Sequence, residues 1–150
     1  MLFRDRVDAG RKLAAVLTRT YKDDDCVVLA LPRGGVPVAA EVAAALRAPL
    51  DLLLVRKIGA PMHPELAVGA VVDGGAPIVV RNEEVIALSG TSERDFKAIC
   101  AREQSEIERR RKRYLSGRPP LDPKGRVVIV IDDGIATGAT VRAALRATRM

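Results

Sequence analysis

Tryptophan is absent from this 150-residue chain, and aromatic residues of all kinds make up only 3% of it. A surface on which the bases of a single nucleic-acid strand stack is therefore poorly supplied. Histidine occurs once, and the two cysteines, Cys26 and Cys100, form no CxxC pair and have no histidine neighbour. Zinc and iron–sulfur sites lack their usual ligands, so we expect two reduced, buried thiols in a cytosolic protein.

Long apolar runs are also missing. None approaches the length of a membrane span, and the charged N-terminus lacks the apolar core of a signal peptide. These absences predict a cytoplasmic protein with no membrane partner. The sequence also lacks the GxxxxGK(S/T) motif of P-loop proteins, which argues against P-loop nucleotide hydrolysis. It has no GxGxxG motif after a strand, which argues against a Rossmann dehydrogenase.

The chain contains 48% hydrophobic and 29% charged residues, which is typical of a globular protein. Its length predicts one domain over residues 1–150. The net charge is +6 and the isoelectric point is about 9.8. This basic balance suits a polyanionic small substrate or a nucleic acid, and a basic solubilising surface explains it equally well.

The clearest signal is the stretch 127–140, VVIVIDDGIATGAT. Its five β-branched residues predict a strand buried on both faces, as in a parallel sheet covered by helices. Asp132 and Asp133 come directly after this strand, and parallel sheets bind ligands beyond the carboxyl ends of their strands. The two carboxylates can accept hydrogen bonds from a diol or bind Mg²⁺. Backbone N–H groups and hydroxyls of 137–140, at a helix N-terminus, favour a phosphate. Together they describe a ribose 5-phosphate site; an Asx turn with an ordinary helix cap is the alternative.

This stretch resembles the phosphoribosyl diphosphate (PRPP) signature of type I phosphoribosyltransferases, in which apolar residues, two acids, a short spacer and T-G-x-T follow one another. The opening FRDR and the helix after it are similar to the start of a bacterial subgroup of that family. The resemblance implies an α/β, Rossmann-like fold with a mostly parallel twisted sheet flanked by helices and a β-hairpin lid. It also implies that the 5-phosphate binds at Ala136, Thr137, Gly138, Ala139 and Thr140, and that the ribose hydroxyls or Mg²⁺ bind at Asp132 and Asp133.

A second anion site is predicted where a strand at 26–31 runs into Pro32-Arg33-Gly34-Gly35 before a helix at 36–46. The glycines let a ligand approach the backbone, and Arg33 adds a charged fork. The loop resembles the family's pyrophosphate loop, which implies a cis peptide at Pro32–Arg33. A strand at 51–55 is expected to place Arg56 and Lys57 at the same edge of the sheet. The predicted pyrophosphate ligands are Arg33, Gly34, Gly35, Arg56 and Lys57, and the predicted catalytic residues are Asp132, Asp133, Arg33 and Lys57.

The remaining pattern predicts helices at 8–20, 82–88 and 92–114, and a hairpin of 67–72 with 77–81 through an Asp-Gly-Gly turn. The resemblance implies that this hairpin region is a lid, and that the lone His63 either touches the substrate there or is simply exposed. The cationic run 109–113 points round several faces of its helix. We expect it to be solvated rather than to bind nucleic acid.

Two departures from the family pattern affect the expected activity. Many relatives have an acidic residue at the position of Ala136, where it handles a proton of the base. The family's domain also normally continues past the position of Met150. We therefore expect either a partner chain at the exposed edge of strand 127–131, as in a homodimer or larger oligomer, or an incomplete domain with weak or no activity.

The leading hypothesis is an Mg²⁺-dependent phosphoribosyltransferase that transfers ribose 5-phosphate from PRPP to a nitrogenous acceptor such as a nucleobase and releases pyrophosphate. The alternatives are a PRPP-binding regulatory protein of the same fold that contacts RNA or DNA through residues 109–113, and an inactive truncated homologue.

Overall fold

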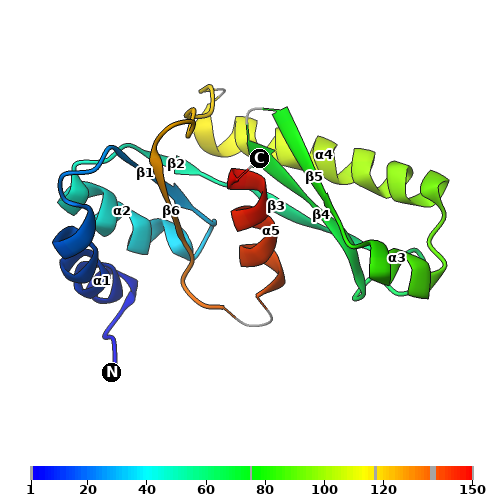
Figure 1. Cartoon of the computed structure of the whole chain (residues 1–150), viewed down its shortest axis with the longest axis horizontal. Helices are drawn as coiled ribbons and strands as arrows, with labels where there is room; N and C mark the ends of the chain where they lie inside the picture. The colour runs from blue at the N-terminus through cyan, green and yellow to red at the C-terminus, as the bar shows by residue number, and fades with distance from the viewer. Residues whose placement is uncertain (1, 75, 117, 136–137, 150) are drawn as a thin grey trace. The chain divides into compact units, whose positions relative to one another are not determined.

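The computed structural model describes residues 2–74, 76–116, 118–135 and 138–149, and Figure 1 shows their helices and strands. The chain divides into two compact units. Unit 1 comprises Met1–Leu53 and Pro120–Val141, and unit 2 comprises Leu54–Pro119 and Arg142–Met150. Each unit contains its own three-stranded sheet.

The sheet of unit 1 is parallel, with the order β2 (Leu50–Leu52), β1 (Cys26–Ala30) and β6 (Val127–Ile131). β1 and β6 pair residue for residue, from Cys26 opposite Val127 to Ala30 opposite Ile131. Every residue of the central strand β1 is buried, which confirms that its continuous apolar run is a strand covered on both faces. Within the described residues β6 is an edge strand of this sheet, and its first four residues are half-buried.

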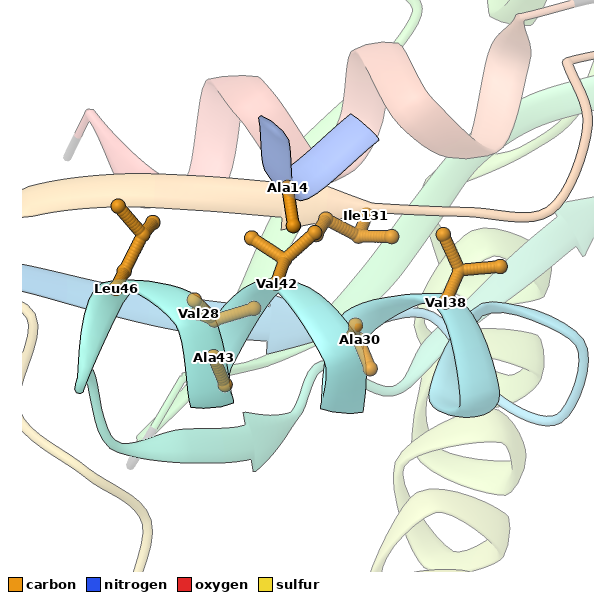
Figure 2. Packing of buried hydrophobic residues seen from close by; sticks show 9 residues of the cluster. Ala14, Val28, Ala30, Val38, Val42, Ala43, Leu46 and Ile131 are labelled. Carbon is orange, nitrogen blue, oxygen red and sulfur yellow. The ribbon is translucent and has the colours of Figure 1, made fainter. Parts of the chain in front are cut away.

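Two helices, α1 (Arg6–Tyr21) and α2 (Gly35–Leu46), pack against each other in unit 1. They approach closely at Gly10, where a Cβ would lie only 2.8 Å from the carbonyl oxygen of Val38. Ala14 of α1 joins residues of α2, β1 and β6 in one apolar core (Figure 2). The labelled members of this core are Ala14, Val28, Ala30, Val38, Val42, Ala43, Leu46 and Ile131.

The sheet of unit 2 is antiparallel, with the order β3 (Val55–Gly59), β4 (Ala67–Gly74) and β5 (Ala76–Arg81). The predicted hairpin is therefore confirmed, as β4 paired with β5. The long helix α4 (Glu93–Leu115) packs along β3 and β4 and buries Phe96, Cys100 and Ile107 on one face (Figure 1).

The helix starts in unit 2 follow from their capping residues. Asn82 precedes α3 (Glu83–Ser89), and its side chain accepts a hydrogen bond from the N–H of Val85 at 3.3 Å. Ser92 precedes α4 and accepts from the N–H of Asp95 at 3.1 Å. Asn and Ser are typical capping residues, because their side chains satisfy N–H groups that a helix leaves unpaired. The last helix, α5 (Ala139–Thr148), begins where the sequence predicts it.

The predicted strand at 51–55 is correct only in its first part, where β2 pairs with β1 in parallel. β2 ends at Leu52, and a new strand, β3, begins at Val55 and pairs with β4 instead. Leu53 and Leu54 are each only 3% exposed, so the middle of the apolar run is buried although the backbone changes its partner strand there. Arg56 and Lys57 consequently lie inside an antiparallel strand of unit 2, and not at the carboxyl end of a parallel strand.

Candidate functional site

The two predicted ligand loops of unit 1 lie side by side. β1 and β6 are parallel neighbours, so the loops after them leave the same edge of the sheet. A Cβ on Gly35 would lie 2.6 Å from the carbonyl oxygen of Ile131 and 3.2 Å from the Cα of Asp132. A Cβ on Gly34 would overlap the carboxylate of Asp133. Both glycines are therefore required by the close approach of the acid pair to this loop.

The Arg-Gly-Gly loop begins with a cis peptide at Pro32–Arg33, as predicted. The N–H of Gly35 donates to the carbonyl of Leu31 at 3.0 Å, and the N–H of Val36 donates to the carbonyl of Arg33 at 3.3 Å. The side chain of Arg33 is exposed and forms no ion pair with any residue that the structure describes. Its positive charge is thus available to an anion from solution.

The two carboxylates of the acid pair have different surroundings. Asp133 accepts hydrogen bonds at Oδ2 from Nε and Nη2 of Arg6, at 2.9 and 2.7 Å. These bonds lower the pKa of Asp133. The pKa of Asp132 is raised, because the side chain is partly buried and lies beside a second carboxylate; its Oδ1 also accepts the backbone N–H of Asp133 at 2.9 Å, which opposes the rise.

Arg6 is the residue of this site that the sequence analysis missed. It is the first residue of α1, and its contact with Asp133 joins positions 127 residues apart. No local spacing can reveal such a pair. One signal was nevertheless present, since the partial positive charge of a helix N-terminus disfavours a cation in the first turn. An arginine in the first turn of a helix, where the helix dipole disfavours it, indicates a role other than stabilising the helix.

The predicted phosphate loop is described from Gly138 onward, and Ala136 and Thr137 lie outside the described residues. Gly138 has φ of +76°, a conformation that favours glycine, and α5 begins at the next residue. Ala139 and Thr140 are exposed in the first turn of this helix. The prediction that the stretch 127–140 is a strand followed by a turn and a helix is confirmed at both of its ends.

Arg56 and Lys57 belong to unit 2 and have partners there. Nε of Arg56 donates to Glu103 of α4 at 2.8 Å, so its charge is largely compensated. Nζ of Lys57 donates to the carbonyl of Glu65 at 3.4 Å and is 3.7 Å from its carboxylate. Lys57 also borders a cleft of about 460 Å³ between β3, the loop after it and α4. His63 and Glu65 are exposed in that loop, and a contact of His63 with the substrate stays a hypothesis.

The cationic run 109–113 is mostly engaged within unit 2. Arg109 and Arg110 both donate to Glu106, each at 2.8 Å. Arg111 pairs with Asp73 of β4 at 2.7 Å, and the two side chains are only 13% and 10% exposed. This run is therefore not a continuous cationic surface, which removes the main support for a nucleic-acid contact.

Both cysteines are free and buried, as predicted, and burial raises the pKa of each thiol. In the described part of the chain, no three His, Cys, Asp or Glu side chains gather into a metal site. Among the described helices none is both long and apolar enough to cross a membrane.

Comparison with known proteins places this geometry in context. The phosphoribosyl transferase domain family matches residues 3–149. A Mycobacterium tuberculosis H37Rv protein named "Putative phosphoribosyl transferase Rv0571c" is 45% identical over 148 residues, which are 99% of this chain and 33% of that protein. Its counterpart in strain CDC 1551 has the same identity and coverage. The crystal structure of TT1426 from Thermus thermophilus has a TM-score of 0.82 and 42% identity, over 99% of this chain and 69% of that one.

Proposed function

The chain belongs to the phosphoribosyl transferase domain family, and on this premise we propose that it binds PRPP and transfers its ribose 5-phosphate to a nitrogenous acceptor. The observation that carries the proposal is the juxtaposition of the Arg-Gly-Gly loop with the acid pair in unit 1. The chain spans about a third of the length of the curated relatives that it matches. The activity and the substrates of the whole protein are therefore part of the proposal.

In the proposed reaction a nitrogen lone pair of the acceptor forms a bond to C1 of the ribose. The bond from C1 to the diphosphate oxygen breaks, the diphosphate leaves with that electron pair, and the acceptor loses a proton. Positive charge develops on the sugar and negative charge on the leaving group. Catalysis by this chain then consists of positioning the two reactants and stabilising those charges.

Each part of unit 1 has a proposed task in this reaction. Arg33 is exposed and has no ion-pair partner among the described residues, so it is placed to stabilise negative charge on the leaving diphosphate. Asp132 and Asp133 accept hydrogen bonds from the ribose hydroxyls. The first turn of α5, with Gly138 before it, binds the 5-phosphate through its N–H groups. Ala136 and Thr137 are proposed to bind the same 5-phosphate.

Two cations of unit 2, Lys57 and Arg56, remain candidate diphosphate ligands. Lys57 is about half exposed, and its contacts with Glu65 are long, at 3.4 and 3.7 Å. It can exchange them for a phosphate oxygen at little cost. Arg56 would first have to leave Glu103, which makes it the weaker of the two candidates.

Mg²⁺ is the proposed metal. Carboxylate oxygens are its preferred protein ligands, and it commonly binds one or two of them together with substrate phosphates and water. Asp132 and Asp133 fit this pattern, as two adjacent carboxylates beside the Arg-Gly-Gly loop. When bound, Mg²⁺ would neutralise charge on the leaving group.

The test is pyrophosphate release by the full-length protein with PRPP, Mg²⁺ and a panel of nucleobases. We expect release that depends on one class of base and that is lost in Arg33→Gln. Tight PRPP binding without release, for every base, would instead indicate a regulatory protein. Absence of both binding and release would contradict the proposal.

A further inference from the structure

We propose that Arg6 is a positioning residue of the ligand site: it holds the Asp133 carboxylate in place while Asp133, and not Arg6, contacts the ligand. This inference rests on the proposed function, because the ligand is the ribose of a phosphorylated sugar. It assigns a task to the first turn of α1, which the sequence pattern of the acid pair does not include.

The contacts of Asp133 carry the inference. Both hydrogen bonds from Arg6 reach Oδ2, at 2.9 and 2.7 Å. The carboxylate also lies so close to Gly34 that a Cβ there would overlap both of its oxygens and its carbon. The carboxylate is thus held by a guanidinium and lies against a backbone that has no side chain, while Oδ1 receives no hydrogen bond from Arg6. Oδ1 is the oxygen that would accept a hydroxyl of the ligand.

The start of α1 is built to hold Arg6 at this place. Asp5 caps the helix by accepting the N–H of Asp8 at 2.8 Å. Asp8 in turn accepts from the N–H of Arg4 at 3.1 Å and from Lys12 at 2.9 Å, which ties the preceding segment to the helix. One turn further, Gly10 allows α1 to cross α2 near Val38, in the first turn of the helix that follows the Arg-Gly-Gly loop.

Stability alone does not explain the pair. The side chains of Arg6 and Asp133 are 60% and 30% exposed, and ion pairs this exposed contribute little to folding. Arg6 also stands at a helix N-terminus, where the helix dipole disfavours a cation. A pair that gains little stability and opposes a local preference is better explained by what it does to the carboxylate.

The chain supplies a matched control in Arg11. It lies on the same helix and pairs with Glu41 of α2 at 3.2 Å, with side chains 67% and 31% exposed. Arg11→Gln therefore removes the same charge, from the same helix, with nearly the same exposure as Arg6→Gln. Any general effect of net charge on the binding of an anion should appear equally in both variants.

The experiment is calorimetric titration of PRPP with Mg²⁺ into the full-length protein and five variants: Arg6→Gln, Arg6→Lys, Arg11→Gln, Asp133→Asn and the double variant Arg6→Gln/Asp133→Asn. We expect Arg6→Gln to weaken binding about tenfold, the cost of a lost hydrogen bond to a charged group. Arg6→Lys should recover part of this loss, since lysine keeps the charge but not the two-pronged contact. Arg11→Gln should bind like the wild type.

The double variant separates positioning from direct contact. If Arg6 acts through Asp133, Arg6→Gln adds no further loss once Asp133→Asn is present, and the two effects are not additive. Additive losses would overturn the inference in favour of a direct contact between Arg6 and the ligand. Equal losses in Arg6→Gln and Arg11→Gln would overturn it in favour of a general charge effect, whether or not binding by Asp133→Asn is measurable.

The outcome also separates this inference from the proposed function. If the wild type binds PRPP and Arg6→Gln binds equally well, only the inference is contradicted. If the wild type does not bind PRPP, the proposed function is contradicted and the inference falls with it. Thermal unfolding of Arg6→Gln and Arg11→Gln should give closely similar midpoints, which excludes a difference in folding as the cause.

Discussion

At the scale of single residues, the candidate site depends on unequal carboxylates. Asp132 and Asp133 are neighbours in the chain, yet burial and the adjacent charge raise the pKa of one while Arg6 lowers the pKa of the other. Two adjacent carboxylates repel each other, and a cation bound to one of them relieves part of that repulsion. The contact with Arg6 therefore helps the two carboxylates to lie close together.

Asp8 gives a prediction at this scale. Hydrogen bonds from Lys12 and Arg4 lower the pKa of Asp8 from 3.8 to about 2. A lowered pKa in the folded state means that the ionised form stabilises the fold above the unfolded value, and that this contribution disappears as the pH falls through about 2. Wild type should therefore unfold at a higher temperature than Asp8→Asn at pH 6, and the difference should shrink as the pH is lowered.

The measurement for Asp8 is a series of thermal unfolding midpoints between neutral and acidic pH. Asp23→Asn, in the exposed turn before β1, is the control and should follow the wild type throughout. A constant difference between wild type and Asp8→Asn across the whole range would show that the carboxylate charge is not what stabilises this segment.

At the scale of elements, α4 is fixed to the sheet of unit 2 by an ion pair as well as by apolar contacts. Arg111 and Asp73 are both largely buried, and loss of Arg111 removes the opposite charge that lies beside the Asp73 carboxylate. We expect Arg111→Met to lower the free energy of unfolding by about 3 kcal/mol. Arg113→Met, exposed on the same helix, should change it by less than about 0.5 kcal/mol. Urea unfolding of both variants measures the difference, and equal values would contradict a structural task for Arg111.

The two loops of the candidate site give a second prediction at the element scale. Gly34→Ala places a methyl group where the Asp133 carboxylate lies, so the loops must separate. We expect PRPP binding to fall by more than about tenfold, because small displacements of positioned groups are costly. Gly34→Ala should also destabilise the fold by about 1–3 kcal/mol through overpacking.

Gly134 offers the steric control for that substitution. A Cβ at Gly134 meets no heavy atom within 4 Å, although the residue follows the acid pair directly. Gly134→Ala should therefore leave the unfolding midpoint unchanged. If Gly34→Ala were equally silent in both unfolding and PRPP binding, the loops would not lie as close together as described.

At the scale of the whole molecule, the sequence predicts best where a single physical pattern decides the structure. Strands β1 and β6 were correctly predicted because a continuously apolar run is typical of a strand covered on both faces, although only β1 is buried along its whole length. The stretch 51–55 has the same pattern but is not one strand. Apolar character reports burial, as at Leu53 and Leu54, and does not report which backbone a residue pairs with.

The candidate site divides in the same way. The acid pair, the Arg-Gly-Gly loop and the start of α5 were identified because strand, turn and helix follow one another within a few residues. The contact between Arg6 and Asp133 was not, because it depends on how α1 packs on α2 and not on any local spacing. Arg56 and Lys57 likewise belong to a strand of unit 2, and not to the parallel strand that was expected to carry them.

The central claim is that the acid pair beside the Arg-Gly-Gly loop binds the ribose of PRPP. Its most direct test is calorimetric titration of PRPP with Mg²⁺ into the wild type and into Asp132→Asn/Asp133→Asn, which removes both charges but keeps side-chain size. We predict measurable binding by the wild type and no detectable binding by the double variant, with both proteins folded. Equal affinity in the two proteins would contradict the claim.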